Sequence, residues 1–186
     1  MAYMNWQTLI SSKRLGKEDR PKPLEERRTE FQRDYDRLIF SAAFRRMQNK
    51  TQVFPLPGSV FVHNRLTHSL EVSSVGRSLG TDVSRELTVR HPELAETELT
   101  GMGAIVSAAC LAHDMGNPPF GHSGERAIRT YFSEGRGREL HNLITDDGRA
   151  LSEAEWMDMT RFDGNANTFR LLTHHFNGRR PGGFVM

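Results

Sequence analysis

Two short runs in this 186-residue chain hold three histidines together with Asp114 and Glu125. Residues 64–71 have the sequence NRLTHSLE, and residues 112–125 have the sequence AHDMGNPPFGHSGE. The residues of interest are His68, His113, Asp114, His122 and Glu125. Neutral imidazoles and carboxylates bind Mn, Fe, Co, Ni, Zn and Mg ions to differing degrees. The two runs therefore predict a metal centre with an acid/base group beside it.

Three of these residues have the character of metal ligands. His68 is expected at the start of one helix, whereas His113 and Asp114 are expected at the end of another. Ligands from two helices fix an ion and leave positions open for water and substrate, and an open position distinguishes a catalytic from a structural metal site. A divalent ion there would polarise a phosphoryl oxygen and lower the pKa of a bound water.

His122 and Glu125 are three residues apart, a spacing that one helical turn brings together. A carboxylate that accepts a hydrogen bond from one ring nitrogen fixes the imidazole tautomer, as general acid/base catalysis requires. Asn117 and the two prolines after it are expected to form the turn that holds this pair in place. His122 is therefore the predicted proton donor and Glu125 its acidic partner.

The elements that must position these residues have helical patterns almost throughout. Residues 101–115 are apolar on nearly every side and rich in small residues, which is typical of a central, closely packed helix. His113 and Asp114 come at the C-terminal end of this predicted core helix. Two ionisable groups in a core are unfavourable unless they are paired or bound to a metal. Further helices are predicted at 29–47, 67–90, 125–132, 153–160 and 165–176.

Details of these segments give further expectations. Thr67 is the expected N-cap of the helix to Arg90, which has apolar residues at Val72, Val75, Leu79, Val83 and Leu87. Residues 134–149 predict a flexible loop, and strand signals are limited to 51–54 and 60–62. The sequence as a whole therefore predicts an all-α fold.

Composition narrows the class of protein. The chain length fits one domain with a real core, and the formal net charge is +2. Cys110 is the only cysteine, which excludes an internal disulfide. No stretch reaches the roughly 18 apolar residues of a membrane helix, so we expect a cytoplasmic protein. Basic residues cluster at 45–50 and at 179–180, either as solvated helix faces or as an anion site.

Four stretches, in this order, resemble the HD-domain deoxynucleoside triphosphate triphosphohydrolases, and in particular their bacterial dGTPase branch. They are FRRMQNKTQVF at 44–54, RLTHSLEV at 65–72, HDMGNPPFGHSGE at 113–125 and DGNANTFR at 163–170. They span most of the chain, and their combination is far more specific than a His-Asp pair alone. The resemblance implies an all-α HD-domain helical bundle whose buried central helix carries His113 and Asp114.

The resemblance also implies an activity, namely metal-dependent hydrolysis of a dNTP, dGTP first, at the α-phosphate to a deoxynucleoside and inorganic triphosphate. By position, the implied metal ligands are His68, His113 and Asp114, and the implied catalytic residues are His122 and Glu125. The implied substrate-binding residues are Gln52 at the sugar 3′-OH, Arg65 near the phosphates, Asn117, and Asn165 at a phosphate. The expected cofactor is Mn or Mg, with Ni, Co, Fe or Zn as alternatives. The expected partners are a dNTP, further copies of the chain, and single-stranded DNA or a nucleotide as effector.

The chain departs from the family in one respect. The fourth family ligand is an aspartate well downstream, and family chains are much longer than this one. Asp146, Asp147, Asp158 and Asp163 do not stand in the matching context. We therefore expect residues 1–186 to form the N-terminal part of a single HD phosphohydrolase domain.

Two other functions remain open on the sequence alone. Another HD-type nucleotide phosphohydrolase or nucleotidase would release phosphate rather than triphosphate. A non-catalytic module that binds nucleotides or single-stranded DNA would use the basic clusters, and its binding would weaken steeply with salt.

Overall fold

The computed structural model describes residues 5–15, 28–51, 64–95, 98–142 and 148–174, and the elements in these ranges are helices joined by turns and loops. The α-helices are α1 (Trp6–Leu9), α2 (Glu30–Phe40), α3 (Ala42–Arg46), α4 (Arg65–Arg90), α5 (Met102–Ala112), α6 (Gly121–Ser133), α7 (Glu153–Thr160) and α8 (Gly164–Thr173). The 3-10 helices are η1 (Met47–Asn49), η2 (Pro92–Leu94), η3 (Glu98–Gly101) and η4 (Arg136–Asn142). No strand occurs in these ranges, so the predicted all-α fold is confirmed. The strand signals at 52–54 and 60–62 lie outside them.

The predicted helix over residues 29–47 is wrong in its continuity. Ser41 has an extended backbone (ψ 147°), and its hydroxyl accepts a hydrogen bond from Phe44 N at 3.1 Å. It therefore caps the start of α3 and separates it from α2, because serine side chains favour such caps over helix interiors. The break turns Phe44 and Met47 inward, and both are buried.

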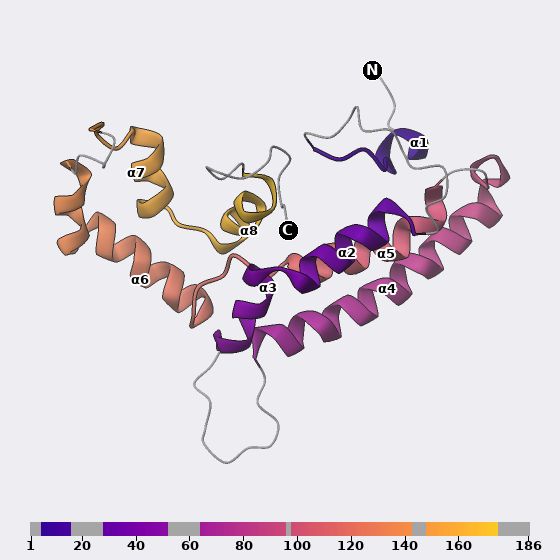
Figure 1. Cartoon of the computed structure of the whole chain (residues 1–186), viewed down its shortest axis with the longest axis horizontal. Coiled ribbons are helices and arrows are strands. Elements are labelled where there is room, and N and C mark those ends of the chain that lie inside the picture. The colour runs from indigo at the N-terminus through magenta and orange to yellow at the C-terminus, as the bar shows by residue number, and fades with distance from the viewer. Residues whose placement is uncertain (1–4, 16–27, 52–63, 96–97, 143–147, 175–186) are drawn as a thin grey trace, which may run out of the picture.

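Helices α2, α4 and α5 lie alongside one another in Figure 1, while α6, α7 and α8 lie beyond the loop that follows α5. The buried apolar cluster stands at the end of α5 from which this loop departs. Its members are Leu38, Phe44, Met47, Leu111, Ala112 and Met115. The prediction of a central apolar helix that delivers His113 and Asp114 from the core is thus confirmed. No helix in the described ranges is both long and apolar enough to span a membrane.

Helix α4 packs against α5 through small residues rather than through its aliphatic ones. The Ser73 hydroxyl lies 2.8 Å from both the carbonyl and the hydroxyl oxygen of Ser107, and both serines are buried. A Cβ atom added to Gly80 would lie 3.0 Å from Met102 O. The two backbones therefore approach closely, which fixes the position of the α4 N-terminus, and with it His68, against the end of α5.

This packing has a consequence for the aliphatic residues of α4. Val75, Leu79 and Val83 are 61%, 60% and 49% exposed, respectively. Their spacing correctly predicted a helix, but they lie away from α5 because the serine and glycine ridge occupies the contact. The predicted N-cap is also shifted: Asn64 caps α4 and Thr67 completes a capping box three residues later.

The remaining elements differ from the predictions mainly at their ends. Helix α6 begins at Gly121, four residues earlier than predicted, which places His122 within its first turn. The described part of the predicted loop 134–149 contains η4, so that prediction is wrong for residues 136–142. Helix α7 has the predicted bounds. Helix α8 begins at Gly164, one residue before the predicted 165–176, and ends at Thr173; residues 175–176 lie outside the described ranges.

Candidate metal centre

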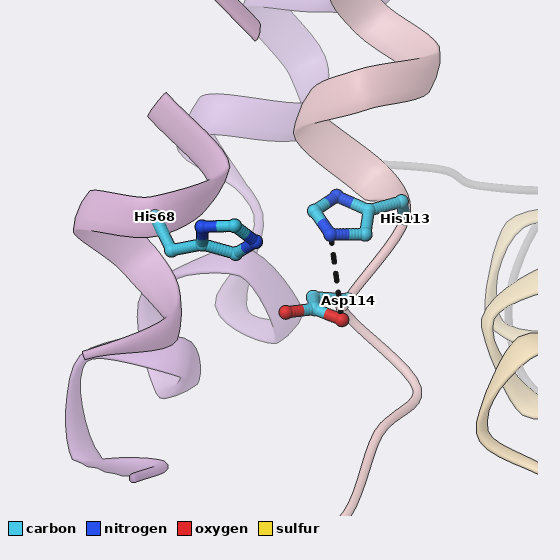
Figure 2. A group of neighbouring side chains, drawn as sticks. All are labelled: His68, His113 and Asp114. Carbon is cyan, nitrogen blue, oxygen red and sulfur yellow. Dashed lines mark ion pairs between the residues drawn. The ribbon is translucent and has the colours of Figure 1, made fainter. Parts of the chain in front are cut away.

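His68, His113 and Asp114 converge from two helices, as the sequence predicts. Figure 2 shows the His68 ring, from the first turns of α4, and the His113 ring, just after α5, on either side of a space that Asp114 borders. One potential ligand atom from each residue lies within 4.8 Å of the other two. The two rings stand edge to face, with centroids 5.4 Å apart. Nitrogen and oxygen donors at this spacing are able to share one ion.

A backbone contact fixes the proton on His113. Its Nδ1 lies 2.7 Å from the carbonyl oxygen of Cys110, one turn earlier in α5. Because a carbonyl only accepts, Nδ1 carries the hydrogen, and a neutral ring presents the lone pair of Nε2. That atom lies 3.5 Å from Asp114 Oδ1 (Figure 2), so two electron-rich atoms face each other. A cation between them fits this donor set, and the contact to Cys110 orients the ring as outer contacts do in metal sites.

Asp114 is held by two side chains besides His113. Arg65 Nη1 lies 2.8 Å from Asp114 Oδ2, and the Asn117 amide donates to Oδ1 at 2.5 Å. Arg65 is only 2% exposed and Asp114 only 5% exposed, so the pair is screened little by water. The two donors therefore fix the direction of the carboxylate. The described contacts of Arg65 and Asn117 are to Asp114, whereas the sequence predicted both residues to bind substrate.

Positive charge surrounds the carboxylate on the side of η1. The Lys50 ammonium donates to Met115 O at 2.9 Å. Burial, followed by the nearby charges of Arg65 and Arg46, holds the pKa of Lys50 below its usual 10.5. Burial is the main cause of this depressed pKa, and the two neighbouring guanidinium groups add to it; the three cations together suit an anionic ligand.

His122 and Glu125 form the predicted pair. His122 Nδ1 lies 3.0 Å from Glu125 Oε2, and the His122 side chain is 97% exposed, whereas Glu125 is buried. The hydrogen bond from His122 is the main reason why the pKa of Glu125 lies below its usual 4.5, and the Gly164 amide at 2.8 Å adds to the effect. Nε2 of His122 therefore remains available to a ligand.

The loop before His122 has an unusual backbone. Phe120 and Gly121 both adopt left-handed conformations, with φ of 66° and 55°. At Gly121 a Cβ atom would lie 3.3 Å from Arg65 Nη2, so the glycine lets the chain pass close over the guanidinium. Phe120 N donates to Thr51 O at 3.0 Å. Gln52, the next residue after Thr51 and a predicted sugar contact, lies outside the described residues.

The last predicted residue and its neighbours behave differently. Asn165 is exposed on the first turn of α8 and, in the described part of the structure, contributes no hydrogen bond to the predicted metal ligands. Its neighbours Gly164, Asn167 and Thr168 contact the loop 113–117 and Glu125 instead. The sequence analysis missed these three. The signal that could have found them is the pair of small residues, Gly116 and Gly164, which permits a close approach.

The part of the chain that carries these residues matches a known protein family. Residues 65–177, which contain all three converging residues and the His122–Glu125 pair, match the model of a family described as "HD domain". The match begins at the first residue of α4 and extends beyond the end of α8.

Several curated relatives are similar along most of the chain. A deoxyguanosinetriphosphate triphosphohydrolase-like protein of Synechocystis is 50% identical over 98% of this chain and 40% of its own length. A protein of the same name from Pseudomonas aeruginosa is 48% identical over 94% of this chain and 38% of its own. The deoxyguanosinetriphosphate triphosphohydrolase of Klebsiella pneumoniae is 41% identical over 76% of this chain and 32% of its own. The chain thus spans at most about 40% of the length of these relatives.

Proposed function

We propose, given that this chain belongs to the HD domain family, that it is the N-terminal catalytic part of a dNTP triphosphohydrolase. The proposed reaction is the hydrolysis of dGTP to deoxyguanosine and inorganic triphosphate. The observation that carries the proposal is the convergence of His68, His113 and Asp114 within 4.8 Å, with His122 and Glu125 paired at 3.0 Å on the following helix. The printed names of the relatives support the choice of dGTP.

In this proposal His68, His113 and Asp114 hold one divalent ion, Mn or Mg in the first place. Such an ion supplies Lewis-acid polarisation of a phosphoryl oxygen and activation of water. The chain's own contribution is orientation: Cys110 O fixes the tautomer of His113, and Arg65 and Asn117 fix the carboxylate of Asp114. Ni, Co, Fe and Zn also accept such a donor set.

His122 serves as the general acid of the proposed reaction. Attack of water on the α-phosphorus breaks the bond to O5′ of the deoxyribose, and the departing oxygen needs a proton. His122 Nδ1 is engaged by Glu125, so the proton comes from Nε2 on the exposed side of the ring. Glu125 does not touch the substrate; it holds the imidazole in the tautomer and direction required.

The substrate phosphates are placed on the cationic side of the loop. Lys50, Arg46 and Arg65 supply the positive potential, and burial of Lys50 and Arg65 strengthens it. Gln52, Asn117 and Asn165 remain the proposed polar contacts to the sugar and phosphates. The predicted domain organisation also remains a proposal, in which residues 1–186 are the N-terminal part of one HD phosphohydrolase domain.

The proposal extends to assembly, regulation and compartment. We place the enzyme in the cytoplasm as a homo-oligomer that responds to nucleotide or single-stranded DNA. Light scattering of the purified protein, with and without a single-stranded oligonucleotide, measures the assembly and its response to single-stranded DNA.

Product analysis in isotope-labelled water tests the proposed reaction. The chain is incubated with dGTP and Mn²⁺ in H₂¹⁸O. The products are separated by ion chromatography, and their masses are measured by mass spectrometry. The expected products are deoxyguanosine without label and inorganic triphosphate with one labelled oxygen, both lost in His113→Ala. Release of phosphate or pyrophosphate, or turnover that survives His113→Ala, contradicts the proposal.

A further inference from the structure

The Thr168 hydroxyl occupies a junction between α8 and the loop that carries the predicted metal ligands. It accepts a hydrogen bond from Gly116 N at 2.9 Å. It also lies 3.2 Å from His113 O and 3.0 Å from Gly164 O, the carbonyls to which it is able to donate its single hydrogen. Thr168 and Gly116 are both buried, so water does not replace these contacts.

The same helical turn makes two more contacts to the site. The Asn167 amide donates to Gly116 O at 2.9 Å, so both polar groups of the Gly116 backbone are bonded to α8. Gly164 N donates to Glu125 Oε1 at 2.8 Å. One turn of α8 thus bonds the loop after His113 on one side and the partner of His122 on the other.

Two glycines show that this contact is close. A Cβ atom at Gly116 would lie 2.5 Å from Gly164 O, and one at Gly164 would lie 2.8 Å from Glu125 Oε1. A side chain larger than hydrogen at Gly116 displaces backbone atoms of α8, and one at Gly164 displaces the side chains of Asn117 and Glu125. The loop and α8 are therefore in backbone contact, and a shift of one is transmitted to the other.

We propose that Thr168 is a positioning residue, whose hydroxyl holds the loop 113–117 and Glu125 in one fixed register. The metal ligands His113 and Asp114 and the His122–Glu125 pair are then placed by a single shared element, the first turn of α8. The spacing between the two pairs, which the proposed reaction needs, is set by this turn rather than by the intervening residues 118–121. The inference rests on the proposed function for the roles of the two pairs, but its structural part stands by itself.

The test compares Thr168→Val, which keeps the shape and removes the hydroxyl, with Thr168→Ser, which keeps the hydroxyl. Thr173→Val is the matched control, because its hydroxyl donates to Phe169 O at 2.8 Å on the exposed end of the same helix. Asn167→Ala is a second variant that removes the other bond to Gly116. Amide hydrogen exchange at Gly116 and Gly164 is measured by NMR, together with Mn²⁺ affinity.

In Thr168→Val, we expect the amide hydrogen of Gly116 to exchange about ten- to a hundredfold faster than in the wild type. The amide of Gly164 also exchanges faster, whereas the amides of α4 and α5 keep their exchange rates. Mn²⁺ affinity falls about tenfold, the lower end for contacts that orient metal ligands. Thr168→Ser and Thr173→Val stay within about twofold of the wild type in both measurements, and Asn167→Ala follows Thr168→Val at Gly116.

Several results overturn the proposal. If the Gly164 amide of Thr168→Val exchanges at the wild-type rate, the hydroxyl does not couple the metal-ligand loop to the His122–Glu125 pair. Equal exchange in the Val and Ser variants, or a uniform rise over α4 and α5, assigns the residue to general packing. If neither the wild type nor any variant binds Mn²⁺, the proposed metal centre is contradicted. The exchange rate of the Gly164 amide in Thr168→Val then tests the positioning role of Thr168 by itself.

Discussion

Arg65 and Asp114 form a buried ion pair, with Arg65 Nη1 2.8 Å from Asp114 Oδ2. Arg65 is the first residue of α4 and Asp114 lies two residues beyond the end of α5, so the pair joins the two helices at the predicted metal centre. Arg65 balances the charge of this carboxylate from one side, and in the proposed metal centre a bound cation would balance it from the other. Asp114 therefore contributes to the contact between α4 and the end of α5 and, in the proposed function, to metal binding.

Removal of Arg65 is expected to destabilise the fold strongly. In Arg65→Ala, the carboxylate of Asp114 stays buried without its guanidinium, and the free energy of unfolding falls by about 3–5 kcal/mol. Urea unfolding measures the change. The control is Arg85→Ala on the same helix, whose ion pair with Asp82 is exposed and contributes at most about 1 kcal/mol.

The same variant links stability to metal. Saturating Mn²⁺ is expected to return part of the stability lost in Arg65→Ala, because the ion compensates the unpaired carboxylate. Two results would contradict this account of Asp114. One is a loss of unfolding free energy below about 1 kcal/mol in metal-free Arg65→Ala, and the other is no recovery of that free energy when Mn²⁺ is added.

Core packing is tested at two leucines that the sequence does not distinguish. Leu111 is 0% exposed in the cluster under the site, whereas Leu79 is 60% exposed on the outer face of α4. Leu111→Ala is expected to lower the free energy of unfolding by about 2–5 kcal/mol. Leu79→Ala changes it by no more than about 0.5 kcal/mol. Equal losses in chemical denaturation would mean that the outer face of α4 is packed.

The close approach of α8 to the loop predicts a steric effect at Gly116. In Gly116→Ala the added Cβ atom meets backbone atoms of α8, including Gly164 O at 2.5 Å and Asn167 C at 2.6 Å. Backbone does not yield as a flexible side chain does, so a loss of about 1–3 kcal/mol is expected in thermal or urea unfolding. Wild-type stability in this variant is incompatible with the contact described.

Glu125 predicts a specific dependence of stability on pH. Its folded-state pKa lies below the usual 4.5, chiefly because His122 donates to it. A depressed carboxyl pKa contributes stability that is fully present above the unfolded pKa and is lost as the pH falls through the folded value. Wild type should therefore exceed Glu125→Gln in stability by the largest margin near neutral pH, and the margin should shrink below pH 4.5.

Unfolding titrations over this range compare the two proteins. Glu134→Gln, which removes an exposed carboxylate just beyond the same helix, controls for the change in net charge. A margin that stays constant or grows on acidification would exclude the assigned role of the His122 hydrogen bond.

The sequence predicts the site well where local rules decide. His122 and Glu125 are joined because one helical turn spans three residues, and His113 and Asp114 follow a helix whose apolar composition places it in the core. The convergence of His68 with them depends on a tertiary contact; the sequence analysis predicted it from the ligand character of the three residues, and the family resemblance implied the same set. Gln52 lies outside the described residues, so its predicted role remains a prediction.

Other features depend on packing that periodicity does not encode. The aliphatic residues of α4 predicted a helix but not its buried face, because the serine and glycine ridge allows closer contact with α5. Thr168 has the sequence context of an ordinary helical residue, and only the distance from its hydroxyl to Gly116 N reveals its contact with the site. The ion pair of Arg65 with Asp114 was likewise not predicted, and the predicted contact of Arg65 with phosphates remains a prediction.

The most direct test of the central claim is the binding of Mn²⁺ to the chain, followed by the loss of the electron paramagnetic resonance signal of the free ion. The proposed centre predicts one site, with affinity at least about tenfold lower in His113→Ala and unchanged in His91→Ala. His91 is an exposed histidine that follows the last residue of α4 and pairs with Glu93. Equal Mn²⁺ binding in wild type and His113→Ala would contradict the centre formed by His68, His113 and Asp114.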